Sequence, residues 1–425
     1  MAERTADAAP DASARSGSLS ACLFAAARTG PQRTALRDSG DRAAWCGRPP
    51  ITWTYAAAAE IVGRLARGIG AWRLPAGSRV GLWFSGGAES ALAHLAVEAA
   101  GHLPCPMPAL WDAAQLSAGI ASAGLVAVLT EGRRGARRPA EDLAQAAMGH
   151  FGLRYLAAFG PGVPDGVISL DAMALERGVV APVASRGLVT FAAGDPGRPV
   201  YRSAAALAAA IDAHLDALPV TADERILTLL PAHDLRGLVT GLGAALSAGA
   251  SLETVIPFDE AGFRAGLMRP VPTRLVVPSL IEAALAALPL PWTVRALNVV
   301  HRAPASTILD ATVGSTGPRR LDSLVFDEDA VLTRSGDLAA TLAHPDRTPL
   351  PRALLDLAFL DLAFLDLGDD QDDAPAYRGL AYRGLACATA VLPRSGVPDP
   401  DARAWRDSGY RPVLSGGAVT GIEAA

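Results

Sequence analysis

The sequence predicts an α/β protein made of two stacked α/β subdomains with mostly parallel sheets, followed by a reduced β-rich third part. Two observations lead to this prediction. Short apolar runs of strand length alternate with longer amphipathic runs over most of the chain, which is typical of parallel sheets covered by helices on both faces. Beyond about residue 320 this alternation breaks down.

The first series of elements begins with a helix that Thr54 can cap and that runs to about Trp72. Ile61, Leu65 and Ile69 recur at helical spacing and give this helix one apolar face. The pattern then predicts a strand at 80–84, a helix at 88–100 and a strand at 125–130.

A second series begins near residue 187 and repeats the same alternation. The expected strands are 188–192, 226–230, 252–256, 274–277 and 294–300, and the expected helices are 203–218, 235–248, 258–267 and 279–288. We therefore expect a first subdomain at 19–185, a second at 186–320, and a β-rich region with tandem repeats at 321–425.

The two ends of the chain differ from the middle in composition. Residues 1–18 are rich in Ala, Asp, Ser and Arg and have no apolar stretch of the kind found in secretion signals, so we expect a disordered tail. Leu355-Asp-Leu-Ala-Phe is repeated from Leu360, and Ala376-Tyr-Arg-Gly-Leu is repeated from Ala381. A five-residue period fits neither helix nor strand, which favours a recent duplication over a solenoid. The acidic stretch 369–373 between the repeats is expected to be a solvated loop.

The composition argues against several classes of protein. The formal net charge is -5 and no basic block is present, so we expect no nucleic-acid partner. The four cysteines have no paired spacing, which predicts reduced thiols in a cytoplasmic protein, and the seven histidines have no metal-ligand spacing. No apolar run is long enough to span a bilayer. All 38 basic residues are arginine and lysine is absent, a bias that the codons of a GC-rich, bacterial genome favour.

Several stretches along the chain form a recognisable series. They are Ile51-Thr-Trp-Thr-Tyr, Pro75-Ala-Gly-Ser-Arg-Val-Gly-Leu, Ala100-Gly-His-Leu-Pro-Cys-Pro, Leu230-Pro-Ala-His-Asp-Leu-Arg-Gly-Leu and Phe258-Asp-Glu-Ala-Gly-Phe. In this order they resemble the adenylate-forming superfamily of acyl-CoA synthetases and adenylation domains. The similarity extends over about residues 20–320. It implies the fold of that family's large N-terminal domain, with ATP or AMP and Mg²⁺ as the ligands a working member would hold.

The family's phosphate-binding loop is rich in Ser, Thr and Gly and ends in Pro-Lys-Gly. The matching stretch here is Ala192-Ala-Gly-Asp-Pro-Gly-Arg-Pro-Val-Tyr. Gly194 and Gly197 are retained, and Arg198 is the nearest cation that would compensate for the lost lysine. The alternative interpretation is a plain strand-to-helix turn.

The same loop has lost the groups that attract phosphate. Val200 stands at the lysine position, and Asp195 places a negative charge where the triphosphate would lie. Arginine is a planar fork and does not replace a lysine that aims one charge at one oxygen.

Two histidines fall at positions that border the substrate in the family. His233 corresponds to a residue near the carboxylate pocket, although a His-Asp pair at a helix start also occurs as simple capping. His301 begins the stretch His-Arg-Ala-Pro, which replaces the family's adenine-facing Gly-Gly-Ala-Pro. Two large side chains there oppose a close backbone approach by a nucleotide, and Arg302 stacking on a base is the alternative.

The remaining family motifs are also altered. Val313-Gly-Ser-Thr-Gly resembles the family's Tyr-Gly-Ser-Thr-Glu, which retains Ser315 and Thr316 as phosphate contacts but puts Gly317 at the metal-binding glutamate. We therefore predict no metal site, and Asp327 and Glu328 lie too far along the sequence to replace that glutamate.

Trp405-Arg-Asp-Ser-Gly-Tyr resembles the family's Trp-x-x-Thr-Gly-Asp, so Tyr410 replaces the aspartate that grips the ribose. The chain ends about where a family member would enter its small C-terminal domain, which carries the lysine used in adenylation.

Together these changes predict a degenerate relative that is inactive in adenylation and acts as an acyl-binding or partner module. The expected partners are an acyl group, an acyl-carrier protein or a true synthetase, and a homo-oligomer is a structural option. The alternative is a working or partial acid-CoA ligase that another chain completes.

Overall fold

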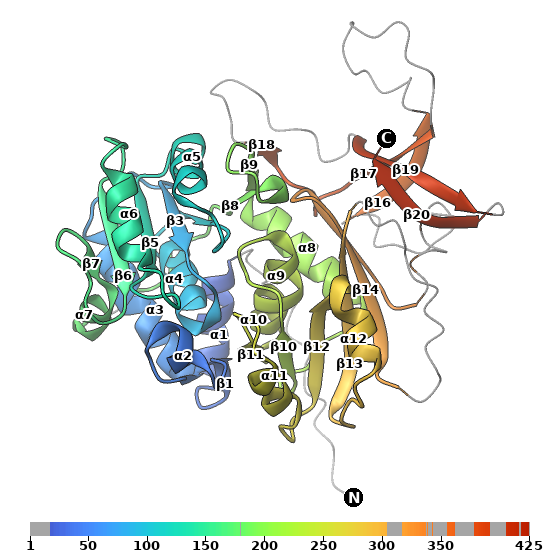
Figure 1. Cartoon of the computed structure of the whole chain (residues 1–425), viewed down its shortest axis with the longest axis horizontal. Helices are drawn as coiled ribbons and strands as arrows, with labels where there is room; N and C mark the ends of the chain where they lie inside the picture. Colours follow the sequence, from blue (N-terminus) through green and yellow to red (C-terminus); the bar gives the residue numbers. More distant parts are fainter. Residues whose placement is uncertain are drawn as a thin grey trace, which may run out of the picture.

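The computed structural model describes residues 18–303 except 179, and then 317–336, 338, 342, 355–361, 378–391, 405–415 and 418–424. It has two large sheets flanked by helices and two small extra sheets (Figure 1). The predicted fold class is therefore confirmed: a mixed α/β chain with parallel sheets and a reduced β-rich part. No helix among the described residues is long and apolar enough to cross a membrane.

The first large sheet has five strands in the order β4-β3-β5-β6-β7, and every neighbouring pair is parallel. Its strands are β3 (Arg79–Trp83), β4 (Leu103–Pro106), β5 (Ala127–Glu131), β6 (Tyr155–Phe159) and β7 (Ile168–Ser169). Its helices are α3 (Tyr55–Gly70), α4 (Gly87–Ala99), α5 (Ala113–Ala123), α6 (Pro139–Ala147) and α7 (Leu170–Leu175). The Thr54 side chain accepts a hydrogen bond from Ala57 N, as expected for the predicted cap.

The second large sheet has eight strands in the order β15-β14-β13-β12-β10-β11-β1-β2. Its strands are β1 (Thr34–Arg37), β2 (Thr52–Thr54), β10 (Arg225–Thr228), β11 (Ser251–Thr254), β12 (Thr273–Pro278), β13 (Val294–Arg302), β14 (Arg319–Phe326) and β15 (Ala330–Arg334). The pairs from β14 to β1 are parallel, and the two edge strands pair antiparallel. The N-terminal strands β1 and β2 thus complete a sheet built mainly from residues 225–334, and the predicted subdomain boundaries stay predictions.

The helices associated with the second sheet are α1 (Leu19–Thr29), α2 (Arg42–Cys46), α8 (Ala204–Ala217), α9 (Leu235–Gly237), α10 (Ala244–Ala248), α11 (Glu260–Leu267) and α12 (Glu282–Ala286), with single 3₁₀ turns at η2 (Ala192–Gly194) and η4 (Ser279–Ile281). The predicted helix 235–248 is present but passes through a π-helical stretch, η3 (Leu238–Gly243). There the Thr240 hydroxyl donates to Arg236 O, and a Cβ on Gly243 would lie 2.5 Å from the Ile211 side chain. Close packing against α8 therefore accompanies the widened turn.

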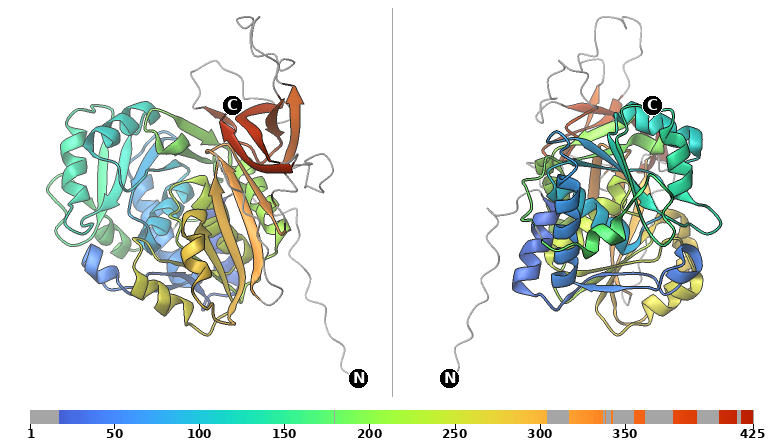
Figure 2. Two further views of the ribbon diagram at one scale, coloured as in Figure 1. Left: turned by 45° about the vertical axis from the view of Figure 1, so that its right-hand side comes forward. Right: turned by 90° about the vertical axis from the view of Figure 1, so that its left-hand side faces the viewer.

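Two small sheets complete the fold. One consists of β8 (Leu188–Phe191), β9 (Pro199–Arg202) and β18 (Ala390–Val391), and the other consists of β16 (Asp356–Asp361), β17 (Arg378–Arg383), β19 (Arg406–Ser415) and β20 (Ala418–Ala424). The second of these lies beyond the end of β14, away from the first large sheet (Figure 2). The first copy of the Leu355 repeat forms β16, while residues 1–17 and the acidic stretch 369–373 lie outside the described residues.

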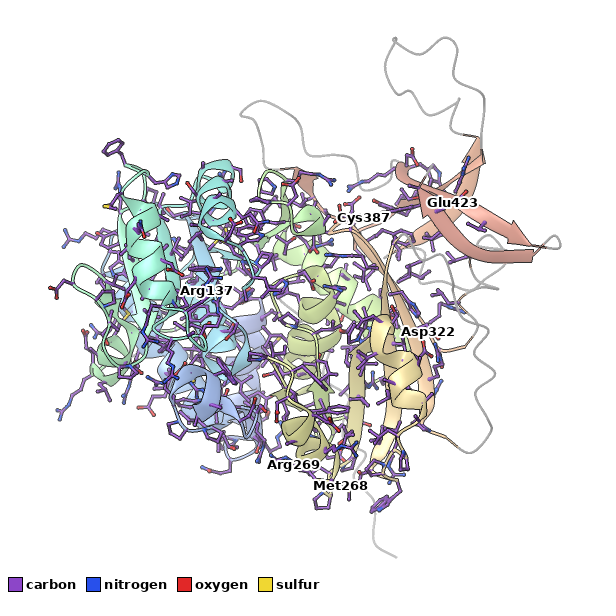
Figure 3. The ribbon with its side chains drawn as sticks, in the orientation of Figure 1. Arg137, Met268, Arg269, Asp322, Cys387 and Glu423 are labelled. Atoms are coloured by element: carbon purple, nitrogen blue, oxygen red, sulfur yellow. The ribbon has the colours of Figure 1, made fainter. Side chains whose placement is uncertain are left out.

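Buried and half-buried polar side chains join both small sheets to the end of β14 in the second large sheet. The Tyr382 hydroxyl of β17 donates to Asp329, which follows β14, and Arg406 of β19 pairs with the same carboxylate at 3.1 Å. Arg202 of β9, which is 1% exposed, donates to the carbonyls of Glu328 and Asp329. Cys387 lies between the two sheets (Figure 3) and is buried. These contacts place β17 and β19 against the end of β14.

Candidate functional site

A cavity of about 660 Å³ opens where the turn after β8 meets the end of β14 and the start of β19. Its lining includes Ala192 and Arg198 of the turn and Val200 of β9. It also includes Phe326 at the end of β14 with the three residues that follow, and residues 405–410 at the start of β19. The predicted phosphate loop and the predicted ribose motif therefore border the same space, although they are more than 200 residues apart in the sequence.

The loop between β8 and β9 forms a tight turn held by its own backbone. Asp195 N donates to Ala192 O at 2.8 Å, and Ala192 N donates to Arg198 O at 2.9 Å. Gly194 has φ +71°, in the left-handed region that glycine tolerates, and the Trp111 indole N–H donates to its carbonyl at 2.9 Å. The loop is therefore fixed in one conformation.

Carboxylates already accept hydrogen bonds from the amides of this loop. Ala193 N donates to Asp327 Oδ1, and Gly197 N donates to Asp195 Oδ1 at 2.8 Å. The Arg198 guanidinium lies 3.4 Å from Asp327 Oδ2. Two backbone donors and the nearest cation, which a phosphate would otherwise engage, are thus paired within the chain.

The end of β14 supplies acidic residues that the sequence spacing did not assign to the site. Asp327 and Glu328 lie beside the loop because β13 and β14 pair in parallel, with Arg302 opposite Val325. Residues that follow the two strands therefore emerge at the same edge of the sheet. A prediction that β13 and β14 pair in parallel would have placed Asp327 and Glu328 near the loop.

Glu328 is a buried carboxylate with incomplete hydrogen bonding. Its side chain is 0% exposed, and Oε2 accepts from Leu235 N at 2.8 Å. Oε1 has no hydrogen-bond partner in the part of the chain described, and Arg302 lies 3.5 Å from it. Burial, together with the nearby Asp234 charge, raises the pKa of Glu328 to about 8, against the opposing effects of the Leu235 N–H and the Thr190 hydroxyl.

Gly317 lies at the other end of β14. It precedes the first residue of that strand and lines a second cavity, of about 610 Å³, beside α12. It is therefore not brought together with Arg198, while Ser315 and Thr316 lie outside the described residues. The carboxylates nearest the loop are instead those that follow β14.

Tyr410 lies on β19 and lines the cavity with Arg198. Its ring centroid is 6.4 Å from that of Phe326. Burial raises the pKa of the Tyr410 hydroxyl, and the charge of Asp327 adds to the effect. Of the predicted residues, Arg198 and Tyr410 thus line one cavity, while Gly194 and Gly197 belong to the turn that carries Arg198.

The two predicted substrate histidines lie in different surroundings. His233 precedes α9, and burial lowers its pKa; the helix is capped by Asp234, which accepts from Gly237 N at 3.2 Å. Arg302 lies 3.8 Å from Asp234, so His233 is next to the charged group behind the cavity. His301 is 3% exposed on β13 and its Nε2 lies 3.0 Å from Asp322 of β14, whose position Figure 3 labels. It belongs to an internal ion-pair group rather than to the cavity lining.

The sequence profile of the AMP-binding enzymes matches residues 23–157. Among solved structures, a benzoate CoA ligase from Burkholderia xenovorans LB400 is 17% identical with a TM-score of 0.72, over 96% of this chain and 79% of that one. ATP-bound MatB from Rhodopseudomonas palustris is 17% identical with a TM-score of 0.71, over 96% and 78%. MbtA from Mycobacterium smegmatis is 21% identical with a TM-score of 0.70, over 96% and 76%. No curated protein sequence matches the chain.

The profile match and these likenesses agree with the motifs quoted above. The resemblance to the adenylate-forming superfamily is confirmed, and the chain has an adenylate-forming ligase-like fold. At identities of 17–21%, the likeness to these solved structures is evidence for the fold alone.

Proposed function

We propose that this protein is a degenerate adenylate-forming relative that does not activate carboxylates and instead acts as an acyl-binding or partner module. The observation that carries the proposal is the pairing of the loop amides with Asp327 and Asp195. A triphosphate would have to displace both carboxylates before it met the backbone donors.

The electrostatic cost of that displacement supports the proposal. Two like charges about 4 Å apart at an effective dielectric constant of about 20 repel by roughly 4 kcal/mol. Arg198 offers little compensation, since it is already paired with Asp327, and Val200 projects no charge from the lysine position. The residues present therefore do not fit a triphosphate, and we derive no step through one.

The retained architecture favours a binding role over loss of all function. One apolar core runs from Leu19 through both large sheets to Ile422 of the last strand. We propose that this scaffold holds an acyl group, or docks an acyl-carrier protein, a true synthetase or a second copy of itself. Buried thiols at Cys46, Cys105 and Cys387 are compatible with our proposal of a cytoplasmic, bacterial protein.

The alternative function is that of a working acid-CoA ligase, alone or completed by another chain. One observation favours it: Arg198 and Glu328 still place a cation and a carboxylate beside the loop, where ATP and Mg²⁺ would need them. Loss of one stabilising donor typically costs about 10²–10³ in rate, so several losses oppose unaided activity.

Carboxylate-dependent pyrophosphate exchange tests the proposal with a panel of acids. We expect no exchange above background, because the triphosphate cannot settle on the loop. A parallel thermal-shift screen uses ATP, AMP and acyl-adenylate mimics. A shift with an acyl ligand but not with ATP supports the acyl-binding role, and silence with every ligand supports a structural partner. Exchange above background would establish the ligase alternative.

A repaired loop provides the matched control. Val200→Lys with Asp195→Thr and Asp327→Ser restores a cation and removes both competing carboxylates, and Val200→Gln with the same two changes differs only in the cation. We expect ATP to stabilise the lysine variant and to leave the natural chain unchanged. Equal ATP binding by the natural chain and the repaired variant would contradict the proposal.

A further inference from the structure

The cavity beside the loop has aromatic walls. Phe326, Tyr382, Trp405 and Tyr410 all line it, and the Phe326 ring centroid lies 5.5 Å from that of Tyr382. The Trp405 ring already makes a cation–π contact, because the Arg383 guanidinium lies 4.2 Å from its centroid. Aromatic faces attract positive charge through their quadrupole, and indole does so most strongly.

The charges that line the cavity are predominantly negative. Four carboxylates, those of Asp327, Glu328, Asp329 and Asp407, share the lining with two arginines. Arg198 is paired with Asp327 at 3.4 Å, and Arg406 is paired with Asp329 at 3.1 Å. Glu328 is paired with Arg302, which lies 3.5 Å away outside the lining, so the Asp407 carboxylate remains in excess, which disfavours an anionic ligand and favours a cation.

Glu328 also offers an unused acceptor. Its side chain is 0% exposed and Oε1 has no hydrogen-bond partner among the residues described. Arg302 is the nearby cation, at 3.5 Å, a distance that makes an ion pair without a hydrogen bond. A buried oxygen without a hydrogen-bond partner is stabilised by a positively charged or N–H-bearing ligand.

We propose that this cavity binds a small organic cation, a quaternary or protonated ammonium compound, between the aromatic walls and the Asp407 carboxylate. A volume of about 660 Å³ suits a small molecule. The inference rests on the proposed function, because a chain that adenylates must admit a triphosphate at this place.

Calorimetric titration of the full chain compares choline with 3,3-dimethylbutan-1-ol, its neutral carbon isostere. Both fill the same space, so the difference in affinity reports the charge alone. We expect choline to bind at least about tenfold more tightly than the alcohol. Equal affinities, or no choline binding at millimolar concentration, would overturn the proposal.

Variants locate the site. We expect Trp405→Ala to weaken choline binding about tenfold and Asp407→Asn to weaken it about threefold, since one removes a π face and the other a charge. The matched control is Trp292→Ala. Trp292 is 77% exposed, its ring centroid lies 5.4 Å from the Arg295 guanidinium, and it lines the other cavity. Loss of binding in the Trp292 variant, with the Trp405 and Asp407 variants unaffected, would contradict the proposal. If Trp405→Ala unfolds the chain, Asp407→Asn decides.

The two proposals fail separately. Pyrophosphate exchange above background refutes the inactive assignment whatever choline does. A silent exchange assay without choline binding refutes the cation site and leaves the inactive assignment intact.

Discussion

In two turns of this molecule, a backbone N–H donates to a carboxylate that is distant in the sequence, but the two carboxylates differ in their exposure to solvent. The turn between β3 and α4, Ser85 to Ala88, has its Ala88 N–H bound to Asp38 at 2.9 Å, and the Asp38 side chain is 2% exposed. The turn after β8 has its Ala193 N–H bound to Asp327, whose side chain is 26% exposed at a cavity. The buried carboxylate stabilises the fold, whereas the more exposed one lines a cavity, where we propose that it occupies the place of a phosphate.

Both oxygens of the carboxylate at the buried turn accept hydrogen bonds. Asp38 also accepts from Ile51 N at 3.1 Å and from Arg42 at 2.6 Å, and Gly87 permits its approach, because a Cβ there would lie 3.1 Å from Asp38 Oδ1. Arg42 is itself 2% exposed and pairs with Glu89. Such a group contributes through satisfied buried charge, so breaking it leaves several orphaned donors.

The largest expected effect follows from that difference. Asp38→Ala should lower the free energy of unfolding by about 3–5 kcal/mol, because Arg42 and two backbone donors lose their partner. Urea denaturation measures the change. Asp327→Ala is the matched control and should cost less than about 1 kcal/mol, as exposed pairs do. Similar losses in both variants would remove the distinction between the two turns.

Glu328 provides a second contrast, since one of its oxygens has no hydrogen-bond partner among the described residues, whereas both oxygens of Asp38 are bonded. Its pKa is raised to about 8 in the folded chain, from an ordinary value of 4.5, so the folded state binds more protons between these pH values. Stability contributed by the neutral form is therefore lost as the pH rises from about 4.5 to about 8.

The change Glu328→Gln should flatten this pH dependence. A neutral amide avoids the cost of a buried charge, so the variant should gain melting temperature relative to the natural chain as the pH rises toward 8. Thermal melts from pH 5 to 9 measure the difference. A constant difference across that range would mean that Glu328 does not titrate there.

A smaller effect concerns stability at acid pH and a buried histidine on the helix that follows the first turn. His94 on α4 is 3% exposed, and burial lowers its pKa to about 4 from 6.5. The unfolded chain then binds more protons between these values, so stability falls as the pH falls from about 6.5 to about 4. We expect His94→Leu to reduce that loss in melts between pH 4 and 7. An unchanged acid limb would assign the loss to other groups.

Local signals predicted the repeating elements well. Thr54 caps α3 as expected, and the apolar runs at 80–84 and 226–230 correspond to β3 and β10. The sequence does not predict the short strands β1 and β2, because three or four residues carry little periodicity and β1 pairs with β11, which is far away in the sequence. Pairing between strands that are distant in the sequence produces no pattern in the sequence of either strand.

The candidate site was predictable only in part, for the same reason. The family motifs identified the loop and Tyr410, and the structure brings both to one cavity. Asp327 and Glu328 lie too far along the sequence from Gly317 to be assigned to the site by spacing, and their position beside the loop depends on the register of β13 against β14. The assignment of His301 to a substrate pocket remains a prediction, and its contact with Asp322 depends on the same register.

The binding of inorganic tripolyphosphate tests most directly whether carboxylates block the loop. Calorimetry compares the natural chain with Asp195→Asn/Asp327→Asn, which keeps the shape of both side chains and removes their charge. We expect no detectable binding by the natural chain and at least about tenfold tighter binding by the double variant. Equal or tighter binding by the natural chain would contradict it.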